Sequence, residues 1–220
     1  MSARDGRTAL VVMARYPEPG KVKTRLASVI GADRACDLYR AFLRDLDARF
    51  AEGKRELVWA YTPATADFAA IVRPGSRCVA QAGANLAERM LHCFVELGAA
   101  GFARIIMIGA DVPHVREEWL DEADAALARC DVVLGPSEDG GYYLVAMRQP
   151  HDIFTGVEMG APRVFQQTME KIATVGLRVE LLPRSFDVDE PEDLRRLRAE
   201  IDRDGHFLPF SAAILHDLEV

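Results

Sequence analysis

The chain has 220 residues, half of them hydrophobic, and carries a formal net charge of −7. This length suits one domain with a substantial core, because single cores rarely grow beyond roughly 250–300 residues. The acidic balance argues against nucleic acid as the main partner, since such proteins usually present a basic excess or a basic face.

The sequence predicts no signal peptide and no membrane span. Its first apolar run, residues 9–14, is shorter than the hydrophobic part of a signal peptide and is followed by Arg15. No apolar stretch approaches the roughly 20 residues that a transmembrane helix needs. The four cysteines lack CxxC spacing, which favours reduced, buried side chains over disulfides or a zinc site. We therefore expect a cytoplasmic protein.

Predicted strands alternate with predicted helices along the chain. Continuous or β-branched apolar runs predict strands over residues 8–14, 56–61, 76–80, 104–110, 131–134, 142–147 and 177–182. Apolar residues at helical spacing predict helices over residues 32–50, 85–97, 116–129 and 161–175, and a last helix from near Glu190. The alternation predicts one α/β domain over residues 1–204 with a mostly parallel sheet. The apolar tail, residues 205–220, is expected to pack on the domain or on a partner subunit, so a homodimer is one expectation.

A basic loop follows the first predicted strand. It contains Arg15, Lys21, Lys23 and Arg25 together with Gly20, and its two prolines exclude regular structure. Ligands of open α/β sheets bind beyond the carboxyl ends of the strands. Clustered cations and free backbone N–H groups suit a phosphate group there. The loop therefore predicts a phosphate site, with a solvated basic loop as the alternative.

Asp111 stands at the end of the predicted strand over residues 104–110, just before Val112 and Pro113. Mg²⁺ needs few protein carboxylates, because water and phosphate oxygens complete its octahedron. Asp111 is therefore a candidate metal ligand, and an aspartate in an ordinary turn is the alternative. We expect His114, in the same loop, to lie at the surface.

Two further acidic segments lie later in the chain. Glu138 and Asp139 precede Gly140 and Gly141, and paired glycines between strands indicate a bulge or a close approach of a ligand. Either acid could act as a base toward an acceptor hydroxyl, and an acidic hairpin turn is the alternative.

Before the last predicted helix, Asp187 alternates with Asp189. Asp189 suits the N-cap position of that helix, followed by Pro191 in the first turn. Asp187 has no such explanation. Two aspartates on an extended segment can also hold a metal.

These segments together resemble a bacterial family of glycosyltransferase-like proteins with the GT-A fold, described as nucleotide-diphospho-sugar transferases. The resemblance is carried by four ordered motifs, at residues 14–27, 109–113, 135–144 and 187–194. It implies a nucleotide-diphospho-sugar transferase fold with a mixed, mainly parallel sheet between helices. The same motifs also resemble guanylyltransferases that act on phospholactate-type substrates, through the Lys-Thr-Arg-Leu loop and the Asp-Gly-Gly segment.

The resemblance also implies roles for the acidic residues, while the basic loop would line the nucleotide-phosphate site. Asp111 would bind Mg²⁺ or Mn²⁺ and take part in catalysis, and Asp139 would act on the acceptor side with its neighbours in residues 138–141. The family often has an acidic residue where this chain has His114, so Asp189 is the better candidate for a second metal ligand.

The sequence leaves three functions open. The first is a metal-dependent glycosyltransferase that uses a nucleotide-diphospho-sugar donor. The alternative is a nucleotidyltransferase that joins a nucleoside triphosphate to a phosphorylated small molecule and releases pyrophosphate. Four cations in one loop are more than a diphosphate requires, which keeps this alternative open. The third is a non-catalytic nucleotide-binding module.

Overall fold

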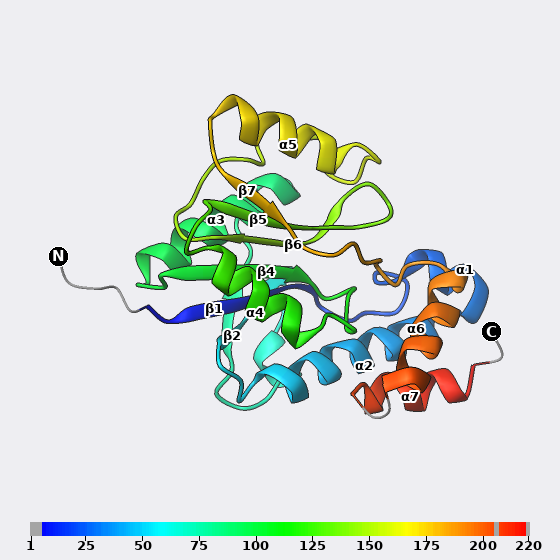
Figure 1. Ribbon diagram of the computed structural model, residues 1–220. Coiled ribbons are helices and arrows are strands. Elements are labelled where there is room, and N and C mark those ends of the chain that lie inside the picture. The colour runs from blue at the N-terminus through cyan, green and yellow to red at the C-terminus, as the bar shows by residue number, and fades with distance from the viewer. Residues whose placement is uncertain (1–5, 205–206, 219–220) are drawn as a thin grey trace.

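A seven-stranded sheet forms the centre of the protein in the computed structural model, which describes residues 6–204 and 207–218 (Figure 1). The strands are β1 (Thr8–Arg15), β2 (Glu56–Thr62), β3 (Arg77–Ala80), β4 (Arg104–Gly109), β5 (Val132–Pro136), β6 (Tyr142–Met147) and β7 (Val179–Leu181). Their order in the sheet is β3-β2-β1-β4-β6-β5-β7. β6 is antiparallel to β4 and β5, and the other pairings are parallel. The predicted mixed, mainly parallel α/β fold is confirmed.

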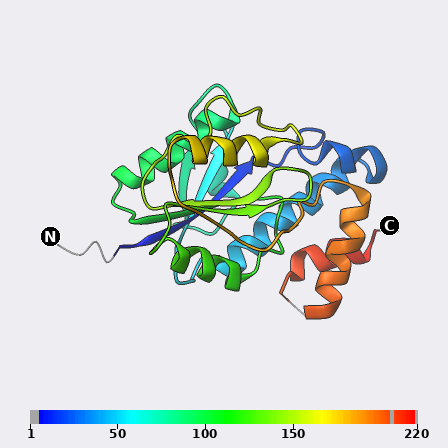
Figure 2. The same cartoon turned by 45° about the horizontal axis from the view of Figure 1, so that its top comes forward.

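Helices cover both faces of the sheet (Figure 2). They are α1 (Thr24–Ile30), α2 (Ala32–Phe50), α3 (Leu86–Ala99), α4 (Glu117–Ala126), α5 (Val164–Thr174), α6 (Pro191–Asp204) and α7 (Pro209–His216), with a short 3₁₀ turn at Phe68–Ala70. α3 and α5 contribute to the core on one face, and the other helices contribute to the core on the opposite face. Every strand and helix predicted from the sequence is present, with ends shifted by a few residues.

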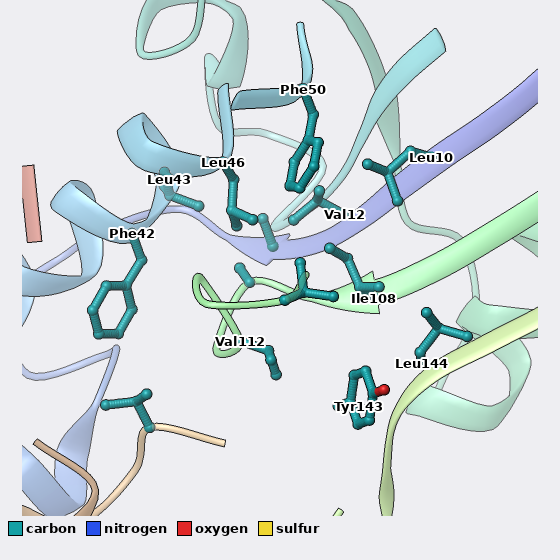
Figure 3. Close-up of a cluster of buried hydrophobic side chains, with 14 of the residues drawn as sticks. Leu10, Val12, Phe42, Leu43, Leu46, Phe50, Ile108, Val112, Tyr143 and Leu144 are labelled. Atoms are coloured by element: carbon teal, nitrogen blue, oxygen red, sulfur yellow. The ribbon is translucent and has the colours of Figure 1, made fainter. Parts of the chain in front are cut away.

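β1 supplies both cores because side chains of a strand alternate between its two faces. Leu10 and Val12 point toward α2, and its Leu46 and Phe50 lie on the same side of β1 (Figure 3). The intervening Val11 belongs to the core under α3 and α5. Burying side chains of this size contributes about 1.5–3 kcal/mol each. Both faces of β1 are therefore closed to solvent, and ligands can reach this strand only at its ends.

The helix α1 is absent from the prediction, which treated the chain up to Arg25 as a loop. Helix α1 begins at Thr24, directly after Lys23, whose φ of +48° lies in the left-handed region. A non-glycine residue rarely adopts that region, and the sequence carries no sign of it. The buried Leu26 is the anchor of this short helix.

The C-terminal helix α7 packs against α2 and α6. The N–H groups of Phe210 and Ser211 donate hydrogen bonds of 3.0 and 2.8 Å to the buried Asp45 carboxylate of α2. Desolvation raises the pKa of Asp45 although these hydrogen bonds oppose the shift. A carboxylate at this place satisfies N–H groups that the first turn of a helix leaves unpaired. The tail predicted to start at Gly205, itself outside the described residues, thus packs on its own chain over residues 207–218.

Two expectations on composition can be compared with the structure. In the described part of the chain, no helix is both long and apolar enough to cross a membrane. The four cysteines are unpaired; Cys78 is partly buried and the other three are buried.

Candidate functional site

The predicted site residues gather at one edge of the sheet. The register pairs Arg15 at the end of β1 with Thr62 of β2, and Met13 with Gly109 of β4, so these three strands end side by side. β6 runs in the opposite direction and begins at this edge. After β7, residues 182–189 cross the same edge toward α6 (Figure 1). The loops that carry the basic and acidic motifs therefore converge, as expected for the carboxyl ends of parallel strands.

Three backbone hydrogen bonds fix the path of the segment over residues 182–189. Leu182 N–H donates to Leu134 O, and Ser185 N–H donates to Pro136 O. Val188 N–H then donates to Asp111 O at 3.0 Å. These contacts carry the chain from β5 across to the loop after β4 and place Asp187 and Asp189 beside Asp111.

Lys23 stands at the centre of the site. Its side chain is only 2% exposed, and its Nζ lies 2.5 Å from Asp111 Oδ1 and 2.9 Å from Asp189 Oδ1. The Nζ also lies over the rings of Tyr39 and Phe42, at 6.0 and 5.6 Å from their centroids. Burial opposes the charged form, but the two carboxylates outweigh it and raise the pKa of Lys23. Lys23 is thus a buried ammonium ion that joins two predicted metal ligands.

The other cations of the basic loop are exposed. Lys21 pairs with Glu18 at 2.6 Å, and Arg25 lies 3.6 Å from Glu190. Exposed pairs of this kind are weak and easily exchanged for another anion. Gly20 adopts a φ of +74°, a left-handed conformation that glycine tolerates better than other residues.

Asp189 does not cap the last helix, contrary to the sequence-based expectation. Helix α6 begins at Pro191, and the carboxylate of Asp193 accepts the N–H groups of Asp189 and Glu190 at 3.1 and 2.8 Å. The Asp189 side chain therefore has another role: its Oδ1 accepts a hydrogen bond from Lys23 Nζ.

Asp187 is partly buried, as are Asp111 and Asp189. Desolvation, with Asp111 and Asp139 next in importance, raises its pKa to about 7, although the Ser137 hydroxyl opposes this by donating to its Oδ2 at 3.0 Å. Like charges held close together favour the protonated form of the most buried member. From the sequence, Asp187 has no capping role and is, with Asp189, one of two aspartates that can hold a metal.

The residues of the segment with the paired glycines make different contacts. Asp139 is exposed and accepts Gly141 N–H at 2.9 Å, whereas Glu138 forms two hydrogen bonds, of 2.7 and 3.0 Å, with Arg196 of α6. That ion pair lowers the pKa of Glu138. Gly140 has a φ of +92°, and a Cβ there would lie 1.9 Å from Pro162 O. The chain's own packing therefore requires this glycine.

His114 is buried, so the expectation of a surface position is wrong. It is 3% exposed, its ring stacks on Phe186 at 4.2 Å, and its Nε2 lies 3.2 Å from Ser185 Oγ. Desolvation, followed by the charge of Arg49, lowers its pKa to about 3. His114 is therefore a neutral packing residue between the loop after β4 and the segment before α6.

Two cavities open at this edge. The larger, of about 590 Å³, is lined by the basic loop, Asp111 and Asp189, and also by Gln81 and Arg89. The smaller, of about 230 Å³, is lined by Asp139 and Asp187 and by apolar side chains. Met13, Leu86 and Gly109 line both.

Gln81 and Arg89 are missing from the sequence-based prediction. Gln81 directly follows β3, so the rule on carboxyl ends that selected Arg15 could have found it. Its amide nitrogen donates to Ala14 O and Ala60 O at 3.3 and 2.7 Å, which holds the side chain at the sheet edge.

The site has carboxylates to offer a divalent cation. Asp111 and Asp189 contact the buried ammonium ion of Lys23, and Asp187 lies close enough to Asp111, Asp139 and Asp189 to feel their charge. Asp111 and Asp189 remain 45% and 43% exposed, and Lys23 takes one oxygen of each. Among the described residues, no three acidic, histidine or cysteine side chains form a ready metal site. Mg²⁺ fits this arrangement because it takes one or two carboxylates and completes its shell with phosphate and water.

Comparisons with known proteins identify the family of this chain and a similar guanylyltransferase. A family model with the description "Uncharacterized protein conserved in bacteria (DUF2064)" matches residues 43–161. A 3-phospho-D-glycerate guanylyltransferase of Phenylobacterium zucineum (strain HLK1) is 32% identical over 182 residues, which cover 78% of this chain and 81% of the relative.

Two solved structures are also similar. A candidate nucleotide-diphospho-sugar transferase of Desulfovibrio desulfuricans G20 has a TM-score of 0.89 and 35% identity, covering 96% of this chain and 94% of that one. A cytidylyltransferase of Leptospira borgpetersenii serovar Hardjo-bovis (strain JB197) has a TM-score of 0.59 at 13% identity, covering 98% and 99%. At this identity, the second likeness concerns the fold alone.

Proposed function

Because this chain belongs to the DUF2064 family and is a transferase of the nucleotidyltransferase or sugar-transferase kind, we propose that it transfers a nucleotidyl group. The substrates of the proposed reaction are a nucleoside triphosphate and a phosphorylated small molecule. Pyrophosphate is the second product. Of the functions that the sequence leaves open, this alternative is better supported than glycosyl transfer.

The observation that carries the proposal is the charge of the larger cavity. Arg15, Lys21, Lys23, Arg25 and Arg89 all line it. A triphosphate carries more negative charge than the diphosphate of a nucleotide sugar and uses more cations. The guanylyltransferase relative supports the same reading, because its match covers most of both chains.

Glycosyl transfer remains the second candidate. It is supported by the similar structure from Desulfovibrio desulfuricans G20, which is described as a candidate nucleotide-diphospho-sugar transferase. The exposed Asp139 at the smaller cavity suits a base that takes a proton from an acceptor hydroxyl. The cations described above are more numerous than this reaction needs, so we place it second.

In the proposed reaction, an oxygen of the acceptor phosphate attacks the α-phosphorus of the nucleotide. The bond from that phosphorus to the bridging oxygen of the β-phosphate breaks, and pyrophosphate leaves. The exposed cations of the basic loop bind the departing phosphates, and Lys23 fixes the positions of Asp111 and Asp189. Asp111 and Asp189 would hold Mg²⁺ or Mn²⁺ through oxygens that Lys23 leaves free. When bound, the metal would neutralise charge on the triphosphate.

The released product tests the proposal directly. The protein is incubated with Mg²⁺, each nucleoside triphosphate and a panel of phosphorylated acceptors, and pyrophosphate is measured. A parallel series contains nucleotide sugars and measures the release of nucleoside diphosphate. We expect pyrophosphate release that depends on the acceptor. Nucleoside diphosphate release from a nucleotide sugar alone would instead establish glycosyl transfer.

A pair of variants connects the activity with the larger cavity. Lys21→Met removes an exposed cation of the basic loop and is expected to raise the KM for the triphosphate about tenfold. Lys54→Met is the matched control, because Lys54 is equally exposed and pairs with Asp121 outside the cavity. An unchanged KM in Lys21→Met would remove this lysine from the phosphate site.

A further inference from the structure

The smaller cavity differs chemically from the larger one. Methionine and other apolar side chains form most of its wall, from Met13 of β1, Met107 of β4 and Met90 of α3 to Met159 before α5. None of the residues that the structure describes around it is a lysine, an arginine or a histidine. At this one edge of the sheet, the larger cavity therefore has a cationic lining and the smaller cavity has an apolar one.

Two aspartates, Asp139 and Asp187, supply the acidic groups of this smaller cavity. Asp139 uses one oxygen to accept Gly141 N–H, and Asp187 uses one to accept the Ser137 hydroxyl, so each has a second oxygen to present. An anionic ligand group inside the cavity would meet the carboxylate of Asp139 and the carboxyl group of Asp187, and would find no cation among the lining residues. A hydroxyl or an apolar group would meet no such penalty.

The position of Leu86 also favours an apolar ligand. This side chain is 45% exposed at the first position of α3 and lines both cavities where they adjoin. A large exposed apolar side chain at such a junction is available for contact with an apolar ligand. The volume of about 230 Å³ is smaller than the roughly 300–1,000 Å³ that drug-sized ligands occupy, so the ligand body must be small.

From these observations we propose that the acceptor is a monophosphate whose small body is apolar and carries no second anionic group. The inference rests on the proposed function, which makes the smaller cavity the acceptor site. The phosphate would lie toward the larger cavity and Lys23, and the body would lie among the methionines. This chain would thus differ in acceptor from its guanylyltransferase relative, whose named substrate, 3-phospho-D-glycerate, carries a carboxylate besides its phosphate.

Two acceptors of similar size test the inference. With GTP and Mg²⁺, kcat/KM for pyrophosphate release is measured with 3-methylbutyl phosphate and with 3-phospho-D-glycerate. We expect 3-methylbutyl phosphate to be preferred by at least about tenfold, since a buried unpaired carboxylate is costly. Equal use of the two acceptors, or a preference for 3-phospho-D-glycerate, would overturn the inference.

A positive charge introduced into the cavity wall makes the test specific. Met159→Arg introduces a cation at a partly buried loop position and should reduce the preference at least about tenfold. Val175→Arg adds the same charge at a side chain that is 54% exposed and outside both cavities, and should leave the preference unchanged. Leu86→Ala, at a half-exposed position, should weaken the use of 3-methylbutyl phosphate several-fold without loss of folding. An unchanged preference in Met159→Arg would contradict the assignment of this cavity.

Binding measurements separate a failure of this inference from a failure of the proposed function. Without pyrophosphate release from any triphosphate and acceptor, the proposed function fails. The stabilisation of the protein by each acceptor alone, measured as a thermal shift, then decides the inference. A larger shift with 3-methylbutyl phosphate that is lost in Met159→Arg supports it. A larger shift with 3-phospho-D-glycerate, or no shift with either, overturns it.

Discussion

Lys23 belongs to the fold as much as to the site. The sequence groups it with three other cations of one loop, yet its side chain is 2% exposed while that of Lys21 is 63% exposed. Removing one member of a buried ion pair leaves the partner charges uncompensated. Neighbouring lysines of one motif are therefore expected to respond differently to substitution.

Lys23→Met should lower the free energy of unfolding by about 1–3 kcal/mol, because Asp111 and Asp189 lose the ammonium ion between them. The lower part of the range for buried pairs applies, since both carboxylates are nearly half exposed. Urea unfolding measures the change. Lys21→Met is the control and should change the free energy by less than about 0.5 kcal/mol. Equal effects of the two substitutions would contradict a structural role of Lys23.

At the scale of elements, the turn between β5 and β6 shows that a pair of glycines can be required by the packing of the chain as well as by a ligand. The sequence interprets Gly140 and Gly141 as a bulge or as room for a ligand. The structure provides a reason for Gly140 that involves no ligand, because the turn lies against Pro162 in the chain before α5.

Gly140→Ala should therefore destabilise the protein strongly, by about 2–4 kcal/mol, since the new Cβ meets backbone that must move. Gly156→Ala is the matched control. Its φ of +83° is similar, but no atom lies within 4 Å of the added Cβ, so only the backbone strain of about 1 kcal/mol is expected. Thermal or urea unfolding compares the two, and equal losses would show that the contact with Pro162 is easily relieved.

At the scale of the whole molecule, the acid limb of the stability curve depends on buried groups. His114 keeps a pKa of about 3 in the folded protein, well below its ordinary value of 6.5, owing to desolvation and then to Arg49, Arg196 and Arg116. The unfolded chain therefore binds a proton below pH 6.5 that the folded protein refuses. The stability from neutral His114 is complete above pH 6.5 and is lost as the pH falls toward 3.

When the pH falls from 7.5 to 5, the free energy of unfolding of the unmodified protein should decrease through His114 by about 2 kcal/mol. The His114→Phe variant should lack this part of the decrease. Phenylalanine retains a ring to stack on Phe186 and binds no proton. Urea unfolding at several pH values measures the two slopes, and the comparison of slopes cancels any constant cost of the substitution. Identical slopes would show that His114 becomes protonated in the folded protein.

The predicted homodimer also belongs to this scale. Its basis in the sequence was the apolar tail, and α7 buries Leu215 of that tail in the core next to α2. The dimer remains a prediction. The apolar tail gives it little support, because that tail packs largely within its own chain.

The sequence by itself determined the fold class and the elements that carry the site. The periodicity of apolar residues indicates which side chains of a strand or helix are buried, and glycine and proline indicate where these elements end. Since ligands of α/β proteins bind at strand ends, polar residues placed there by local pattern indicate the site without knowledge of the packing. The basic loop and the acidic motifs at Asp111, Asp139 and Asp189 were located in this way.

Only the tertiary structure decided which of these residues meet. The burial of Lys23, the raised pKa of Asp187 and the neutral state of His114 all depend on distances between segments far apart in the chain. Desolvation and Coulomb interaction are set by those distances, and local sequence patterns do not contain them. For the same physical reason, the division of one sheet edge into a cationic and an apolar cavity could be read only from the folded chain.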